Sequence, residues 1–159
     1  MLNIRIVCVG KLKEKYWMDA CSEYMKRLKP YCNAEIAEVR EEKLPANAST
    51  ADEIKVIEAE GRNILDRIAK SDYVIALDVR GNEKSSEEIA DIMSKVSFTH
   101  SSIAIIIGGS LGLSADVKAR ADMKLSFGRI TLPHQLARVV ALEQIYRAFK
   151  INAGEAYHK

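Results

Sequence analysis

The chain has 159 residues, of which 48% are hydrophobic and 29% are charged, a composition typical of one folded domain with a packed core. It contains no apolar run long enough for a membrane span, and its N-terminus does not have the order of a secretory signal. We therefore expect a single domain, residues 1–159, in the cytoplasm. Three cysteines without a C-x-x-C pair favour buried, reduced thiols over disulfides or a zinc site.

The net charge of +2 is unevenly distributed along the chain. Residues 1–30 carry +4, residues 31–100 carry −6 and residues 101–159 carry +4. If the two basic ends meet in space, they form a surface suited to a polyanion, whereas separate ends are ordinary solvated faces.

The first half of the chain begins with a strand at residues 3–10, where apolar residues alternate with others up to a glycine. A helix is predicted over residues 15–30, because apolar residues recur at helical spacing until Pro30 ends it. We assign its aromatic residues, Tyr16 and Trp17 among them, to packing rather than to base stacking. A weaker strand at residues 34–39 and a polar loop at residues 40–50 follow.

The second half alternates helices and strands in the same way. Capping boxes mark two helix starts, at Thr50-x-x-Glu53 and at Ser85-x-x-Glu88. The other elements are, in order, buried strands at residues 73–81 and 102–109, a short helix with Ser114 as N-cap, a strand at residues 123–128 and a last helix that Pro133 opens. The pattern predicts an α/β fold with a mainly parallel sheet covered by helices on both faces, whose ligands lie beyond the carboxyl ends of the strands.

The stretch "IIIGGSLG" at residues 105–112 ends one such strand in glycines. It lacks the lysine of a phosphate-binding loop and the spacing of a dinucleotide fingerprint, so it is either a tight turn or a loop for a ligand without phosphates. No metal-ligand spacing and no G-x-S-x-G elbow occur, so we expect no metal.

The last helix is apolar on more than one side, which predicts burial against a second subunit or, alternatively, a central position in a monomer. The tail after it ends in Tyr157, His158 and Lys159. This ending is either frayed or a source of donors and of a group that titrates near neutral pH.

The segments "YVIALDVRGNEKSSEEIA", "IIIGGSLGL", "LSFGRITLPHQLARVVALEQIYRAFKI" and "GEAYHK", with the opening "VGKLKEKYW", closely resemble the SPOUT methyltransferases. Within these, they are similar to the ribosomal RNA large subunit methyltransferase H family over essentially the whole chain. The resemblance implies methylation of N3 of pseudouridine 1915 in 23S ribosomal RNA within the ribosome. It also implies S-adenosylmethionine as methyl donor, a homodimer and a C-terminal trefoil knot, a feature that general connection rules disfavour.

The resemblance also implies roles for individual residues. The cofactor-binding positions are Leu77, Gly108, Gly109, Phe127, Gly128, Arg129, Ile130, Thr131 and Leu132. His158 is the candidate proton acceptor with Tyr157 beside it, the tail acting across the dimer, and Asp78 and His134 are alternatives. Arg138, Arg147 and Lys159 are candidate contacts to the RNA, as is Arg129. Two rival functions remain, a nucleotide-binding or oxidoreductase module and a non-catalytic RNA-binding factor.

Overall fold

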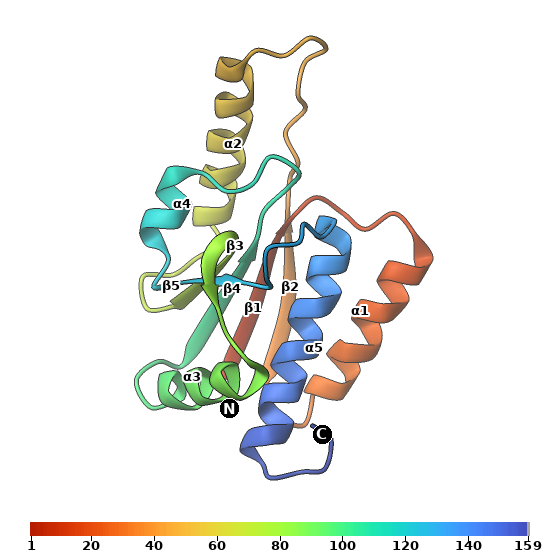
Figure 1. The fold of residues 1–159 in the computed structure, drawn as a ribbon, viewed down its shortest axis with the longest axis vertical. Coiled ribbons are helices and arrows are strands. Elements are labelled where there is room, and N and C mark those ends of the chain that lie inside the picture. The colour runs from red at the N-terminus through yellow and green to blue at the C-terminus, as the bar shows by residue number, and fades with distance from the viewer. Residues whose placement is uncertain (159) are drawn as a thin grey trace.

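The computed structural model describes residues 1–158 and has one parallel sheet with helices on both faces (Figure 1). Its five strands lie in the order β2-β1-β4-β3-β5, and every neighbouring pair is parallel. The strands are β1 (Asn3–Val9), β2 (Asn33–Val39), β3 (Tyr73–Glu83), β4 (Ser102–Ile107) and β5 (Met123–Ser126). The helices are α1 (Lys15–Leu28), α2 (Thr50–Leu65), α3 (Ser86–Ser97), α4 (Ala115–Arg120) and α5 (His134–Asn152). The predicted α/β fold is confirmed.

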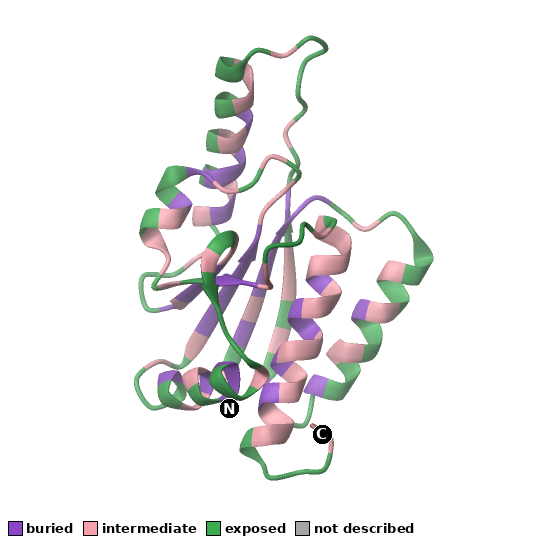
Figure 2. Cartoon of the chain, viewed as in Figure 1, coloured by how far each residue is buried: buried purple, intermediate pink, exposed green. Residues whose placement is uncertain are grey.

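Apolar residues of the central strands alternate between two separate cores. Ile103 and Ile105 of β4 face the core beneath α1, α3 and α5, whereas Ala104 and Ile106 face the core beneath α2 and α4. The buried residues therefore concentrate in the sheet and on the inner sides of the helices (Figure 2). A strand buried on both faces reads as a continuous apolar run, which is why β4 was recognisable in the sequence.

Side-chain caps fix where the helices begin. Ser85 and Ser114 cap α3 and α4 as predicted, and the Ser85–Glu88 capping box is present. The predicted Thr50–Glu53 box is wrong by one residue: Ser49 is the N-cap of α2, and its partner is Asp52. A neighbouring Ser and Thr, each followed three residues later by an acid, gave two equivalent frames.

Two further predictions are decided by burial. All three cysteines are free and buried, as predicted, and burial raises the pKa of Cys8 to about 12. Tyr16 is 65% exposed, so its assignment to packing is wrong, whereas Trp17 is half-buried. Among residues 1–158, no helix combines the length and the apolar character needed to cross a membrane.

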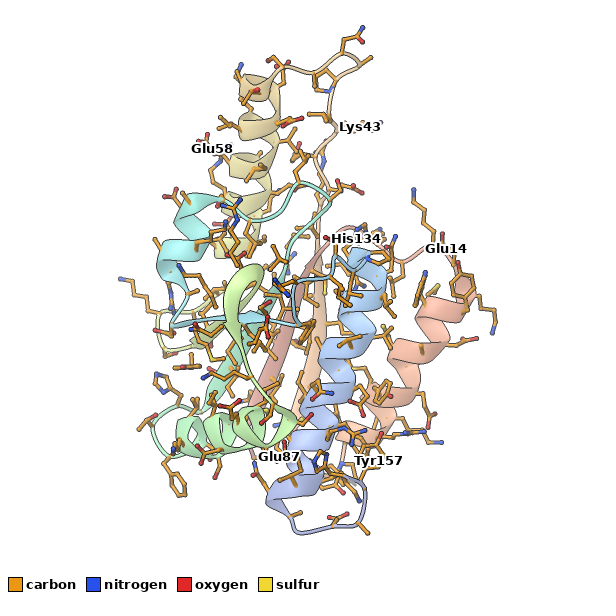
Figure 3. The ribbon with its side chains drawn as sticks, in the orientation of Figure 1. Glu14, Lys43, Glu58, Glu87, His134 and Tyr157 are labelled. Carbon is orange, nitrogen blue, oxygen red and sulfur yellow. The ribbon has the colours of Figure 1, made fainter. Side chains whose placement is uncertain are left out.

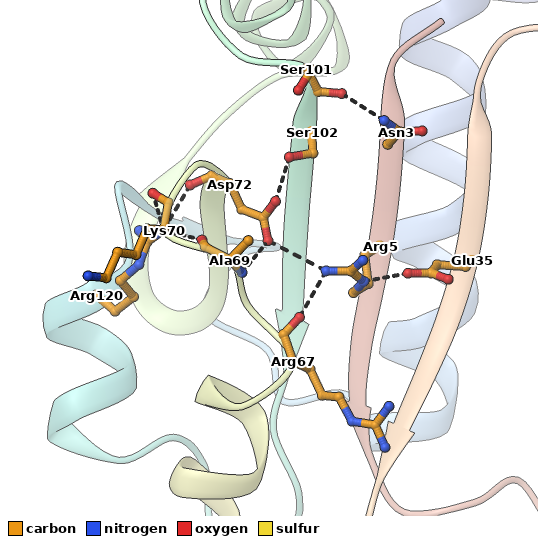
Figure 4. A network of polar contacts seen from close by, with 10 residues as sticks. All are labelled: Asn3, Arg5, Glu35, Arg67, Ala69, Lys70, Asp72, Ser101, Ser102 and Arg120. Atoms are coloured by element: carbon orange, nitrogen blue, oxygen red, sulfur yellow. Dashed lines mark hydrogen bonds and ion pairs between the residues drawn. The ribbon is translucent and has the colours of Figure 1, made fainter.

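A polar network lies at the amino-terminal ends of the strands (Figure 4). The buried Asp72 carboxylate accepts hydrogen bonds from the Ala69 N–H at 2.8 Å and from the Ser102 hydroxyl, and the Arg5 guanidinium lies 3.6 Å away. Arg5 also donates to the Arg67 carbonyl at 2.9 Å. Because buried polar groups are costly unless paired, this network stabilises the amino-terminal ends of the strands. Ligands of parallel sheets bind at the other, carboxyl ends.

Candidate functional site

A pocket of about 700 Å³ lies beyond the carboxyl ends of β3, β4 and β5. Eight of the nine predicted cofactor positions line it: Leu77, Gly108, Gly109, Phe127, Gly128, Ile130, Thr131 and Leu132. Arg129 is exposed and lies outside the lining of the pocket, between Gly128 and Ile130, and its role in cofactor binding stays a prediction. Residues 78–80, 110–113 and 133–134 complete most of the wall.

The loop after β4 needs glycine because it folds tightly onto itself. A Cβ at Gly108 would lie 2.8 Å from Leu113 Cδ2, so the end of that side chain would have to move, and 3.1 Å from the Gly112 carbonyl oxygen, which is tighter than most such contacts. The Gly112 N–H donates to the Gly109 carbonyl at 3.1 Å and closes the turn. Backbone rather than side chain therefore forms this wall of the pocket.

A second wall comes from a bulge in β3. Leu77 and Asn82 both pair with Leu125 of β5, so the four residues between them are pushed out of the sheet toward the pocket. Gly81 allows this path, because a Cβ there would lie 2.7 Å from the carbonyl of Lys124. The bulge places Asp78 in the pocket wall, which makes it one of the two alternative bases that lie there.

Ser126 is a site residue that the sequence analysis missed. Its hydroxyl is buried, lies 3.0 Å from the carbonyl oxygens of Val79 and Gly128, and accepts the Gly128 N–H at 3.1 Å. It therefore fastens the β3 bulge to the loop after β5. A polar residue between the apolar Leu125 and Phe127 at a buried strand end was the available signal.

The charges in the pocket are few and mostly compensated. The Asp78 carboxylate accepts the Arg80 N–H at 3.0 Å and lies 3.7 Å from the Lys118 ammonium. His134 lines the wall at the start of α5. In residues 127–132 the backbone N–H groups of Ile130, Thr131 and Leu132 have no partner among the described residues. The site thus offers apolar surface and free backbone donors rather than a cluster of cations.

Arg138 makes structural contacts in this chain, and its predicted contact with RNA stays a prediction. It is 2% exposed, donates to Glu38 Oε2 at 2.9 Å and to the Gly10 carbonyl at 3.2 Å, and leaves its Nε without a partner. It ties α5 to the ends of β1 and β2.

The predicted catalytic tail lies at the other end of α5 from the pocket (Figure 3). Tyr157 donates to Glu143 at 3.1 Å, and His158 Nε2 lies 2.6 Å from a Glu87 carboxylate oxygen. A helix of 19 residues is about 28 Å long, so the tail does not reach the pocket of its own chain. Lys159 lies outside the described residues.

Arg147 holds this tail rather than standing free for RNA. Its guanidinium pairs with Glu143 at 2.7 Å, lies 4.7 Å from the Tyr157 ring centroid and approaches His158 Nδ1 to 3.2 Å. Partial burial, followed by the hydrogen bond to Glu143, raises the pKa of Tyr157. The hydrogen bonds from its own backbone N–H and then from His158 hold the pKa of Glu87 below its usual value.

A parallel α/β domain with a glycine-walled pocket beyond its strand ends is typical of proteins that bind a small ligand there. The sequence profile described as "Predicted SPOUT methyltransferase" matches residues 2–158. The chain therefore belongs to the SPOUT methyltransferase family. Among the described residues, no His, Cys, Asp and Glu side chains group as a metal site would require.

Relatives with assigned names are similar over their full length. The chain is 55% identical to the Ribosomal RNA large subunit methyltransferase H of Clostridium novyi, with 99% of this chain and 100% of that protein covered. It is 53% identical to the protein of the same name from Carboxydothermus hydrogenoformans, with the same coverage.

Solved structures share the fold at low sequence identity. A probable methylase family protein from Haemophilus influenzae matches with a TM-score of 0.55 and 18% identity, over 98% of this chain and 70% of that one. The tRNA (m1G37) methyltransferase of Aquifex aeolicus matches with a TM-score of 0.53 and 15% identity, over 91% and 69%.

Proposed function

We propose that this methyltransferase transfers a methyl group from S-adenosylmethionine to N3 of pseudouridine 1915 in 23S ribosomal RNA. The observation that carries the proposal is the glycine-walled pocket at the strand ends in a chain of this family. The names of the relatives, at 50% to 55% identity over whole chains, support a ribosomal RNA substrate. A substrate within the ribosome also favours a cytoplasmic location.

The residues of the pocket fit such a donor. The adenine of this donor is an apolar ring with a few polar edges, and Leu77, Phe127 and Leu132 supply apolar wall beside free backbone N–H groups. Lys118, a cation of the wall, is engaged by Asp78, and the glycine turn lacks the lysine of a phosphate-binding loop. When bound, the donor supplies a methyl group already activated by its sulfonium. The pocket's role is to hold it in line with the accepting nitrogen.

Proton removal is the chemistry left to the side chains. N3 of pseudouridine bears a proton between two carbonyls and accepts a methyl group once that proton leaves. His158 Nδ1 faces an Arg147 donor, and His158 Nε2 faces a carboxylate, so the neutral ring carries its proton on Nε2 in this arrangement. Released from these partners, the same imidazole would take the N3 proton.

We further propose a homodimer in which the tail of one chain completes the pocket of the other. Leu136 and Val140 lie on α5 outside the core, and Ile130 at the pocket mouth is 69% exposed. Two α5 helices packed antiparallel about a two-fold axis bring the C-terminal end of each beside the N-terminal end of the other. Within one chain the tail and the pocket lie at opposite ends of α5, whose 19 residues span about 28 Å at 1.5 Å per residue. The antiparallel arrangement brings the tail of one chain to the pocket of the other. The trefoil knot stays a prediction.

Calorimetry separates the donor from rival nucleotides. We expect the protein to bind S-adenosylmethionine and neither NAD nor ATP, because the pocket has no phosphate-binding lysine or glycine fingerprint. Gly108→Val should greatly weaken that binding, since a side chain there crowds both Leu113 and the backbone of Gly112. A circular dichroism melt serves as the folding control. Tighter binding of NAD or ATP than of S-adenosylmethionine would refute the proposed function.

Transfer of labelled methyl groups tests the substrate. Because double-stranded and folded RNA is recognised mostly by its shape, we expect recognition to require folded, assembled RNA. Ribosomes that lack the modification should be good substrates and naked 23S RNA a poor one, with label recovered in 3-methylpseudouridine. Equal rates on both would contradict the assembled substrate, and label in another nucleoside would contradict the site.

A further inference from the structure

We infer that residues 11–18, here named the basic-aromatic segment, form a second contact surface for the RNA beside the pocket. In this inference, which rests on the proposed function, Lys11 and Lys13 contact phosphates and Tyr16 stacks on an unpaired base. The segment plays no part in the pocket described above.

The segment presents charge and an aromatic face to solvent. Lys11, Lys13 and Tyr16 are exposed, and the tilted Trp17 ring lies 5.1 Å from that of Tyr16, centroid to centroid. Lys15 is paired with Asp19 at 2.6 Å, whereas neither Lys11 nor Lys13 has an acidic partner within residues 1–158. Tyr16 does not belong to the hydrophobic core, and its ring is left to pack against Trp17 and to face solvent.

Hydrogen bonds through Glu38 and Arg138 fix the segment next to the pocket. The Glu38 carboxylate oxygen that pairs with Arg138 also lies 3.3 Å from the Leu12 N–H, and Arg138 donates to the carbonyl of Gly10. Arg138 stands one helical turn after His134, which lines the pocket. In Figure 3, Glu14 and His134 lie at a similar height, and Tyr157 lies at the opposite end of α5 from His134.

RNA suits this surface better than a second copy of the chain does. Lysines are depleted in the cores of protein interfaces, and a two-fold contact through this segment would bring like charges together. Phosphates neutralise lysines, and any unpaired base has a face on which an aromatic ring stacks. The target nucleotide must itself be accessible, so unpaired neighbours lie within reach of a surface beside the pocket.

Tyr16 is tested by its apparent KM for unmodified ribosomes. We expect Tyr16→Ala to raise KM roughly ten-fold, within the range measured for loss of one stacked base, with kcat nearly unchanged. Tyr16→Phe should keep the wild-type KM. Phe98→Ala is the matched control: Phe98 is 86% exposed but follows α3, before the amino-terminal end of β4.

The lysines are tested by salt dependence of ribosome binding. A double Lys11→Gln, Lys13→Gln variant should reduce the slope of log affinity against log salt by about 1.4, or about 0.7 per phosphate contact for unpaired RNA. Lys26→Gln with Lys29→Gln removes the same charge at the far end of α1 and should leave the slope nearer to wild type.

Three results would overturn the inference: an unchanged KM for Tyr16→Ala, an equally large rise in KM for Phe98→Ala, or a shift of the Tyr16→Ala protein to monomer in sedimentation. The last would assign the segment to a subunit interface. Failure of the proposed function is a different outcome. There the wild type transfers no methyl group, while filter binding of ribosomes by the same variants still decides whether the segment contacts RNA.

Discussion

Two separately inactive variants, Gly108→Val in the pocket and His158→Ala in the tail, are expected to restore methyl transfer when they share one dimer. In such a mixed dimer, the intact pocket of the His158→Ala chain faces the intact tail of the Gly108→Val chain. One of the two sites is then complete, so activity per dimer should reach about half of wild type. Each variant alone should lose on the order of a hundred-fold or more, as expected for removing a proton acceptor or the donor site.

The control reverses the expectation. A mixed dimer of wild type with a chain that carries both changes has an intact pocket and tail only within one polypeptide. It should be inactive if the tail acts on the partner and about half active if it acts on its own chain. Co-expression with two affinity tags supplies both mixed dimers, and methyl transfer to ribosomes measures them. Activity of the control with inactivity of the first dimer would exclude the shared site.

Replacement of Arg138 should destabilise the fold rather than weaken RNA binding alone. Arg138→Ala removes the buried donor to Gly10 and the partner of Glu38, and leaves a cavity in the core beneath α5. We expect the free energy of unfolding to fall by about 3 kcal/mol. This is the low end for a broken buried ion pair, because Glu38 is 34% exposed and stays partly solvated. For a domain of this size that lowers Tm by roughly 6–12 °C.

Thermal unfolding of three variants checks this expectation. Arg138→Lys keeps a charge but not both hydrogen bonds, and should fall between Arg138→Ala and wild type. Arg129→Ala removes an exposed arginine nearby and should change stability by about 0.5 kcal/mol or less. A normal melting temperature for Arg138→Ala, together with weaker ribosome binding, would assign Arg138 to the RNA surface.

The sheet was predictable because two sequence signals identify its strands: apolar runs, and the glycines or capping residues that follow them. The pocket was predictable for the same reason, since parallel strands put Leu77, Gly108 and Phe127 at one edge. The strand order was not, because neighbouring positions in the sheet depend on packing between segments distant in the chain. The resemblance to a family supplied the pocket residues that local pattern left open.

Helical spacing indicates the burial of Arg138 but is misleading for Tyr16. Arg138 lies at helical spacing from Ala141, Leu142 and Ile145, so a helical projection of α5 places it on the buried face despite its charge. Tyr16 shares the spacing of apolar residues in α1 but stands in its first turn, past the end of the sheet, where no core extends to cover it. Periodicity identifies a face, and only the tertiary fold shows how far along the helix that face is covered.

The distance between the tail and its own pocket could not be obtained from sequence. It follows from α5 running the full depth of the sheet, with Glu87, Glu143 and Arg147 holding the tail at its far end. This is the feature that makes a second chain necessary for the proposed chemistry. The contacts within one chain thus keep the tail ordered where a partner would meet it.

A crystal structure with S-adenosylmethionine bound tests the central claim most directly. We expect the donor to lie against Leu77, the Gly108–Gly112 turn and residues 127–132, with Tyr157 and His158 of the second chain at the pocket mouth. Donor bound elsewhere, or an active protein whose pocket meets no second chain, would contradict it.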